Sequence, residues 1–135
     1  MNNQDLILES LELCAETGVD ITNPVYERFF ELSDSGHELM HHSDDHMRGR
    51  MLEQVYELLF ATDFDDPNSY LHWELDNHLV GYHATPEMYE AFFAALTEIV
   101  GKTIGEDVWH QKFAQAWSVP IEKILIEVNQ FYQKL

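Results

Sequence analysis

The sequence predicts an all-α protein, and two observations lead to this fold class. Apolar residues recur at the three- and four-residue spacing of amphipathic helices along nearly the whole chain, without convincing strand alternation. Short polar connections separate these segments, and no interdomain linker or internal repeat interrupts them. Apolar residues make up 45% of the 135 residues, which is a globular composition. We therefore expect a single domain over residues 1–135, built from about six helices.

The charge balance and the single cysteine limit the partners and the compartment. The chain has 25 acidic and 7 basic residues, so nucleic acid is not expected as a partner, because phosphate contacts need clustered Lys and Arg. The longest apolar run, 91–96, is too short to span a membrane, and the N-terminus does not resemble a signal peptide. Cys14 has no partner for an internal disulfide, which fits a cytoplasmic protein.

Two helices are predicted before residue 37. The first covers residues 4–17 and ends before a glycine, a common C-terminal stop. The second starts at Thr22, with Asn23 as its N-cap and a proline in its first turn. The turn-forming residues 34–36 interrupt this helix. Residues 37–46 follow as a polar connection with a turn or two of helix.

The middle of the chain contains two more predicted helices. The first of these covers residues 45–60, where Ser and Asp residues precede an apolar stripe and supply a cap. A loop over residues 62–68 follows, because Asp, Pro and Asn are concentrated there. The next helix covers residues 69–79 and contains His78.

The last predicted helices differ in how they end. One starts at Pro86, in the first-turn position that proline favours, and ends near Gly101 and Gly105. The final segment covers residues 106–133. Pro120 lies inside it and removes one backbone donor, which predicts a kink or a break.

His78 is the polar residue that draws attention, because it lies on an apolar stripe. Leu71, Leu75, His78 and Leu79 recur at spacings that place them on one helix face. Glu74 and its polar neighbours are expected mostly elsewhere. One interpretation is a core histidine with satisfied nitrogens. The other is a ligand to a metal held between helices.

Several stretches spread over the chain resemble single-domain bacterial globins, the haem-binding relatives of myoglobin. They are the aromatic segment 25–32, the start of a distal helix at 50–52, His78 in the place of the proximal haem ligand, the Pro-Glu-x-Tyr corner within 81–89, and the Ala-Trp pair 116–117. The corner, with a histidine eight residues before its proline, is moderately specific. The resemblance covers nearly the whole chain and implies a globin-like stack of helices around a haem pocket.

The resemblance also implies which residues surround the haem. His78 would be the axial ligand of the iron. Tyr26 stands where many bacterial globins carry a tyrosine whose hydroxyl donates to bound oxygen, although a tyrosine beside two phenylalanines is also typical of a core. Met40 stands where the family has a phenylalanine that packs on the porphyrin. The other expected pocket residues are Phe30, Arg48, Leu52, Val55, Leu75, His83 and Phe92.

Three polar side chains have open roles in this implied pocket. Arg48 takes the place of a distal Gln or His, and it would donate to the gas ligand, pair with a haem propionate, or extend into solvent. His83 would pair with a propionate or be an exposed loop residue. Glu74 replaces an aliphatic residue one turn before His78, where a carboxylate is costly unless it points to water.

The implied function is reversible binding of a diatomic gas, oxygen or nitric oxide, for oxygen storage or transport, or for nitric oxide handling or sensing. Enzymatic activity is not expected, except a nitric oxide dioxygenase type of reaction that needs a separate reductase. A homodimer is compatible with the sequence.

Two other functions remain open. One is non-haem metal binding, because two histidine pairs with i, i+4 spacing lie within ten residues: His37, His41, His42 and His46. The other is a haem-free globin-like interaction domain, which Met40 and Glu74 favour.

Overall fold

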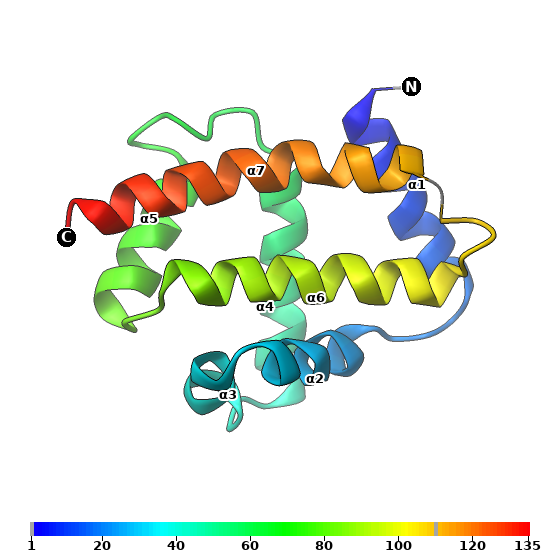
Figure 1. Cartoon of the computed structure of the whole chain (residues 1–135), viewed down its shortest axis with the longest axis horizontal. Helices are drawn as coiled ribbons and strands as arrows, with labels where there is room; N and C mark the ends of the chain where they lie inside the picture. The colour runs from blue at the N-terminus through cyan, green and yellow to red at the C-terminus, as the bar shows by residue number, and fades with distance from the viewer. Residues whose placement is uncertain (1, 110) are drawn as a thin grey trace.

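The computed structural model describes residues 2–109 and 111–135 and confirms an all-α architecture for that part of the chain (Figure 1). Residue 110, inside the predicted final segment, lies outside the described residues. The described chain has seven α-helices and one π-helical segment, where about six helices were predicted. In order these are α1 (Asn3–Glu16), α2 (Thr22–Leu32), α3 (Asp34–Met40), α4 (Asp45–Leu59), α5 (Tyr70–Leu75), η1 (Asp76–Gly81), α6 (Pro86–Ile104) and α7 (Gln111–Gln133).

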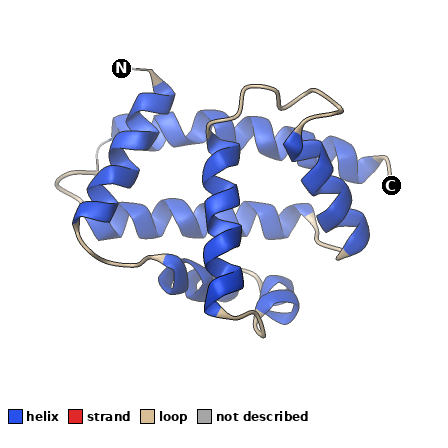
Figure 2. Cartoon of the chain, turned by 180° about the vertical axis from the view of Figure 1, so that it is seen from behind, coloured by secondary structure: helices blue, strands red, loops and turns tan. Residues whose placement is uncertain are grey.

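The two longest helices, α6 and α7, run antiparallel and form one layer (Figure 1). Helix α4 lies behind this layer in the view of Figure 1 and crosses α6 and α7 at a steep angle, as the view from behind shows (Figure 2). Helix α1 packs against one end of both α6 and α7, and α2 packs along α6. The short helix α5 lies near the C-terminal end of α7. Among the described residues, no helix has the length and apolarity needed to span a membrane.

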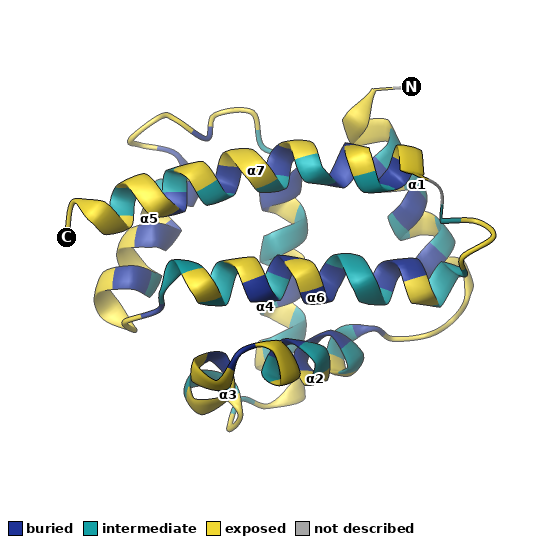
Figure 3. Cartoon of the chain, in the orientation of Figure 1, coloured by how far each residue is buried: buried dark blue, intermediate teal, exposed yellow. Residues whose placement is uncertain are grey.

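Buried and exposed positions alternate along α6 and α7, as expected for helices with one side in a core (Figure 3). The buried apolar residues form two groups, and the partly buried Met88 and Phe92 of α6 contact both. The larger group joins α1, α4, α5, α6 and α7. The smaller group is centred on Tyr26, Phe29, Ala91 and Ala95, with Phe30 and Met40 packed against it.

Two predicted helix boundaries in the first half are wrong. Asn23 does not cap α2, because the helix already starts at Thr22 after Ile21, and no side chain caps it. The second helix is interrupted as predicted, but at the extended Ser33 rather than at 34–36. These residues begin α3, because the Ser33 hydroxyl accepts from the Gly36 N–H and caps a new helix. Gly36 is buried there, where Phe29 of α2 leaves no room for a larger side chain.

The predictions for the last helices are confirmed in part. Helix α6 ends at Ile104 with Gly105 as its C-cap, as predicted, whereas Gly101 is a buried helical position covered by the Trp109 ring, which leaves little room for a Cβ. Of the predicted kink or break at Pro120, the break does not occur, because α7 continues from Gln111 to Gln133. Proline removes only one backbone donor, and here it lies on the buried side with Trp117 and Ile124, so packing holds the helix together.

Candidate functional site

His78 lies in the π-helical segment η1, where the predicted helix over residues 69–79 changes its winding after Leu75. The wider turn ends with the Tyr82 N–H donating to the Asn77 carbonyl at 3.2 Å. The Ala84 N–H then donates to the His78 carbonyl at 2.9 Å, which fixes the corner before α6. Single π-helical turns are often found at functional positions, because they shift the side chains that follow.

The two ring nitrogens of His78 have different surroundings. Nδ1 lies 3.1 Å from the Tyr89 hydroxyl oxygen, whereas Nε2 has no hydrogen-bond partner among the described residues. Burial lowers the pKa of His78 below its usual value, so the ring is neutral at pH 7. When Nδ1 donates its proton to Tyr89, Nε2 carries a lone pair that can bind a metal ion. Tyr89 is therefore a site residue that was not predicted, although it belongs to the Pro-Glu-x-Tyr corner.

Tyr26 of α2 carries a buried hydroxyl group without a partner. The residue is 1% exposed, and its hydroxyl oxygen has no hydrogen bond among the described residues. Its ring makes edge contacts with the rings of Phe29, Phe30 and Phe92. Burial raises the pKa of Tyr26 to about 12, so the hydroxyl keeps its proton and remains a donor. An unsatisfied buried donor costs about 1–3 kcal/mol of stability. A ligand that accepts a hydrogen bond from this hydroxyl would remove that cost.

Helix α6 connects Tyr26 with His78. Tyr89 and Phe92 are three residues apart and therefore lie on the same face of α6. Tyr89 contacts the His78 ring, and Phe92 contacts the Tyr26 ring, with ring centroids 5.4 Å apart. The rings of Tyr26 and His78 thus contact residues on the same face of α6 from two different segments, α2 and η1.

The expected apolar pocket residues divide between the two core groups. Leu52, Leu75 and the partly buried Val55 belong to the larger group, and Phe30 and Met40 pack against the smaller one. Phe92 contacts both groups. The predicted set is therefore divided between the two groups rather than forming one continuous cluster, and Phe92 links them.

Arg48 of α4 is half-buried and does not extend freely into solvent. Its Nε donates to the Ser43 hydroxyl at 2.8 Å, and its Nη2 donates to the His41 carbonyl at 3.2 Å. Nη1 lies 3.4 Å from the side-chain oxygen of Asn23. These contacts tie the first turns of α4 and α2 to the connection after α3.

Glu74 and His83 differ in burial: Glu74 is buried, and His83 is exposed. Glu74 is only 5% exposed, so the expectation that it lies away from the buried face of its helix is wrong. The reason is its position between Leu71 and Leu75 on the inner side of α5. Burial, together with the nearby charge of Glu57, raises its pKa. His83 is exposed, with a φ of 60° in the left-handed region.

The histidine-rich segment does not gather ligands for a metal ion. The rings of His37 and His41 stack with centroids 5.1 Å apart, and His41 Nδ1 lies 2.9 Å from the His37 carbonyl oxygen. Over residues 2–109 and 111–135, no group of three or more His, Cys, Asp or Glu side chains is arranged to hold a metal. The non-haem metal hypothesis therefore has no support in this geometry.

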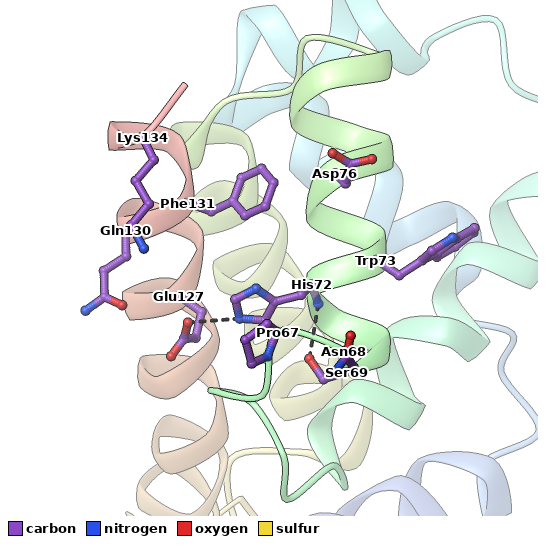
Figure 4. A pocket seen from close by; sticks show the side chains of 10 residues that line it. All are labelled: Pro67, Asn68, Ser69, His72, Trp73, Asp76, Glu127, Gln130, Phe131 and Lys134. Atoms are coloured by element: carbon purple, nitrogen blue, oxygen red, sulfur yellow. Dashed lines mark hydrogen bonds and ion pairs between the residues drawn. The ribbon is translucent and has the colours of Figure 1, made fainter.

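A surface cleft of about 590 Å³ lies between α5 and the end of α7 (Figure 4). His72 Nε2 lies 3.1 Å from both the Phe64 carbonyl and the Glu127 carboxylate, and these contacts hold α5 against α7. The pairing was not predicted, because Glu127 lies 55 residues from His72 and no local pattern connects them. Phe131 and Trp73 also line the cleft.

Comparison with known proteins identifies no relative. No protein-family model, curated protein or solved structure matches this chain.

Proposed function

We propose that this protein is a haem-binding globin that reversibly binds a diatomic gas, oxygen or nitric oxide. One observation carries the proposal: a neutral His78 with an unpartnered Nε2 contacts Tyr89, and the ring of Tyr26, whose buried hydroxyl has no partner, contacts Phe92 on the same face of α6. The resemblance of the corner 81–89 to bacterial globins agrees with this assignment. The crossing of α4 over the α6–α7 pair is compatible with a globin-like stack (Figure 2).

Several described residues support binding of the group that this function needs. His78 Nε2 would bind the haem iron, with Nδ1 held by Tyr89. Leu52, Val55, Leu75 and Phe92 would supply apolar contacts to the ring. Haem would supply an iron that can bind the gas.

The unpartnered hydroxyl of Tyr26 suits a gas ligand that accepts a hydrogen bond. The donor is oriented by three aromatic neighbours and keeps its proton well above neutral pH. A preorganised donor in a dry site forms a stronger hydrogen bond than the same group in water. A hydrogen bond from Tyr26 to the gas would serve storage, transport and nitric oxide handling alike. Catalytic turnover of nitric oxide would in addition need a separate reductase.

The test is the visible absorption spectrum of the purified protein, with haem supplied during expression, before and after addition of dithionite and carbon monoxide. We expect a Soret band that shifts with carbon monoxide. His78→Ala removes or displaces this band, because it removes the axial nitrogen. His42→Ala is the matched control, since it removes an exposed imidazole outside the site.

Absence of a Soret band at any haem supply would rule out the proposal. The buried Glu74 carboxyl favours one alternative in that case, a haem-free interaction domain, because a carboxylate near a haem edge opposes binding. Such a protein would remain colourless, and His78→Ala would leave its fold and its partner binding intact.

A further inference from the structure

The guanidinium group of Arg48 lies over two aromatic rings of the candidate site. Its central carbon is 5.3 Å from the ring centroid of Tyr26 and 5.3 Å from that of Phe30. Both distances are within the range of cation–π attraction, which is stronger where the pair is shielded from water. Arg48 is half-buried, and Tyr26 is almost completely buried. The positive charge is therefore held beside a phenol whose hydroxyl has no partner.

Three polar contacts fix the guanidinium group in this position. Nε donates to Ser43, whose own hydroxyl donates to the Met40 carbonyl at 2.6 Å. Nη2 donates to the His41 carbonyl, and Nη1 reaches Asn23 at 3.4 Å. All three guanidinium nitrogens are engaged with the α2 start and the α3–α4 connection. These contacts use three of the five N–H donors of the guanidinium group and hold its plane in place beside the two rings.

The charge acts on the acidity of the Tyr26 phenol. Burial raises the pKa of Tyr26, and the nearby Arg48 charge partly opposes this rise. A cation beside the ring stabilises negative charge on the phenol oxygen, and a more acidic hydroxyl is a stronger hydrogen-bond donor. Arg48 is thus the charged group whose proximity favours ionisation of Tyr26.

We propose that Arg48 is a positioning residue that strengthens the Tyr26 hydroxyl as a donor and thereby favours oxygen over carbon monoxide. This inference rests on the proposed gas-binding function. Bound oxygen accepts a hydrogen bond strongly because it carries partial negative charge, whereas bound carbon monoxide accepts one weakly. A stronger Tyr26 donor therefore slows the release of oxygen and leaves the release of carbon monoxide nearly unchanged.

The gas-binding test compares Arg48→Met, Tyr26→Phe and the double variant. We expect oxygen to dissociate about fivefold faster from Arg48→Met, the factor that corresponds to ~1 kcal/mol. Carbon monoxide dissociation should change by less than about twofold. In the Tyr26→Phe background, Arg48→Met should have no further effect on oxygen release, because the group through which it acts is absent. Arg50→Met is the matched control, since it removes an exposed positive charge from the same helix.

A second readout uses the haem-free protein and tests the electrostatic coupling alone. With 3-fluorotyrosine incorporated, ¹⁹F NMR follows the ionisation of each phenol, and Tyr26→Phe assigns the Tyr26 signal. We expect Arg48→Met to raise the pKa of that phenol, because a stabilising cation is lost. Arg50→Met should leave it unchanged.

The outcomes separate the two proposals. An unchanged Tyr26 pKa in Arg48→Met overturns the coupling, whether or not haem binds. An Arg48→Met effect that persists with Tyr26→Phe overturns the inference in favour of direct donation, and equal effects on both gases indicate a structural role only. If no haem is bound, the gas-binding function fails and the oxygen preference fails with it, while the NMR result still reports on the coupling.

Discussion

Glu74 is a carboxyl side chain in an apolar setting, one helical turn before the candidate axial histidine. It lies on the inner side of α5 and is 5% exposed, and burial is the largest cause of its raised pKa. Its charge also raises the pKa of Tyr89, the partner of His78. The charge state of Glu74 therefore affects the pKa of the Tyr89 hydroxyl, which is hydrogen-bonded to the His78 ring.

The raised pKa of Glu74 predicts a pH dependence of stability. The folded state binds this proton more tightly than the unfolded state, so stability is lost as the pH rises from the ordinary glutamate pKa through the raised folded-state value. Glu74→Gln should remove this loss and raise the free energy of unfolding above that window, on the order of 1 kcal/mol. Urea unfolding curves measured across this pH range check the prediction.

Glu57→Gln serves as the comparison, because Glu57 is exposed and acts on Glu74 only through its charge. It should weaken the pH dependence without abolishing it. A Glu74→Gln protein with the same pH profile as the parent would show that this carboxyl group does not control the titration.

At the scale of helices, α1 and α7 are joined by a buried hydrogen bond. The Trp117 indole N–H donates to the Ser10 hydroxyl at 2.9 Å, and that hydroxyl donates to the Ile7 carbonyl at 2.7 Å. Ser10 and Trp117 are both fully buried. The contact satisfies the indole, which has no access to water.

Ser10→Ala should therefore lower the free energy of unfolding by about 1–3 kcal/mol, because it leaves the Trp117 N–H buried without an acceptor. Ser118→Ala is the matched control, since its exposed hydroxyl binds only a carbonyl of its own helix. Chemical denaturation of both variants gives the comparison. Equal losses would show that the indole finds another acceptor in Ser10→Ala.

A second helix contact depends on the absence of a side chain. A Cβ on Gly36 of α3 would lie 2.4 Å from the Cζ of Phe29, a ring that is itself buried beside Tyr26 and Phe92. Gly36→Ala should destabilise the fold by about 1–3 kcal/mol, because the ring has no free space into which it can move. A thermal or urea unfolding midpoint measures the change.

Gly49→Ala tests the same substitution without the clash. Nothing lies within 4 Å of a Cβ at Gly49, which is inside α4. Alanine should stabilise this helix by about 0.5–1 kcal/mol. Opposite signs for the two variants are expected, and destabilisation of both would show that the helix positions, not the Phe29 contact, decide the outcome.

At the scale of the whole molecule, charge works against folding. The formal net charge is −18, and few cations are available to offset it. The ion pairs of the described residues draw on Arg28 and Lys102, which share Glu98. Self-repulsion of the remaining carboxylates should therefore destabilise the folded state at low salt.

Added salt should raise the unfolding midpoint. Increasing NaCl from about 0.02 M to about 0.5 M shortens the Debye length several-fold and screens this repulsion. Glu53→Lys, at an exposed position of α4, should raise the low-salt midpoint and reduce the salt effect. A midpoint that does not respond to salt would show that the charges are already too far apart to interact.

The sequence by itself determined the all-α class and most of the helices, because apolar periodicity and capping residues are local signals. It also placed His78 on an inward face. It failed where the packing of one helix against others decides the outcome: α7 continues through Pro120, Gly101 is covered by Trp109, and Glu74 is buried rather than exposed. Local spacing does not report which side of a helix a neighbouring element covers.

Only the tertiary structure decided how the candidate site is assembled. The sequence singled out Tyr26 and Arg48. Only the three-dimensional structure shows that these two residues are in contact and that the Tyr26 hydroxyl has no partner. The hydrogen bond between Tyr89 and His78 likewise became visible only there. The physical reason is that periodicity reports which face of a helix is buried. Which side chain it meets there depends on how α2, α4, η1 and α6 pack together.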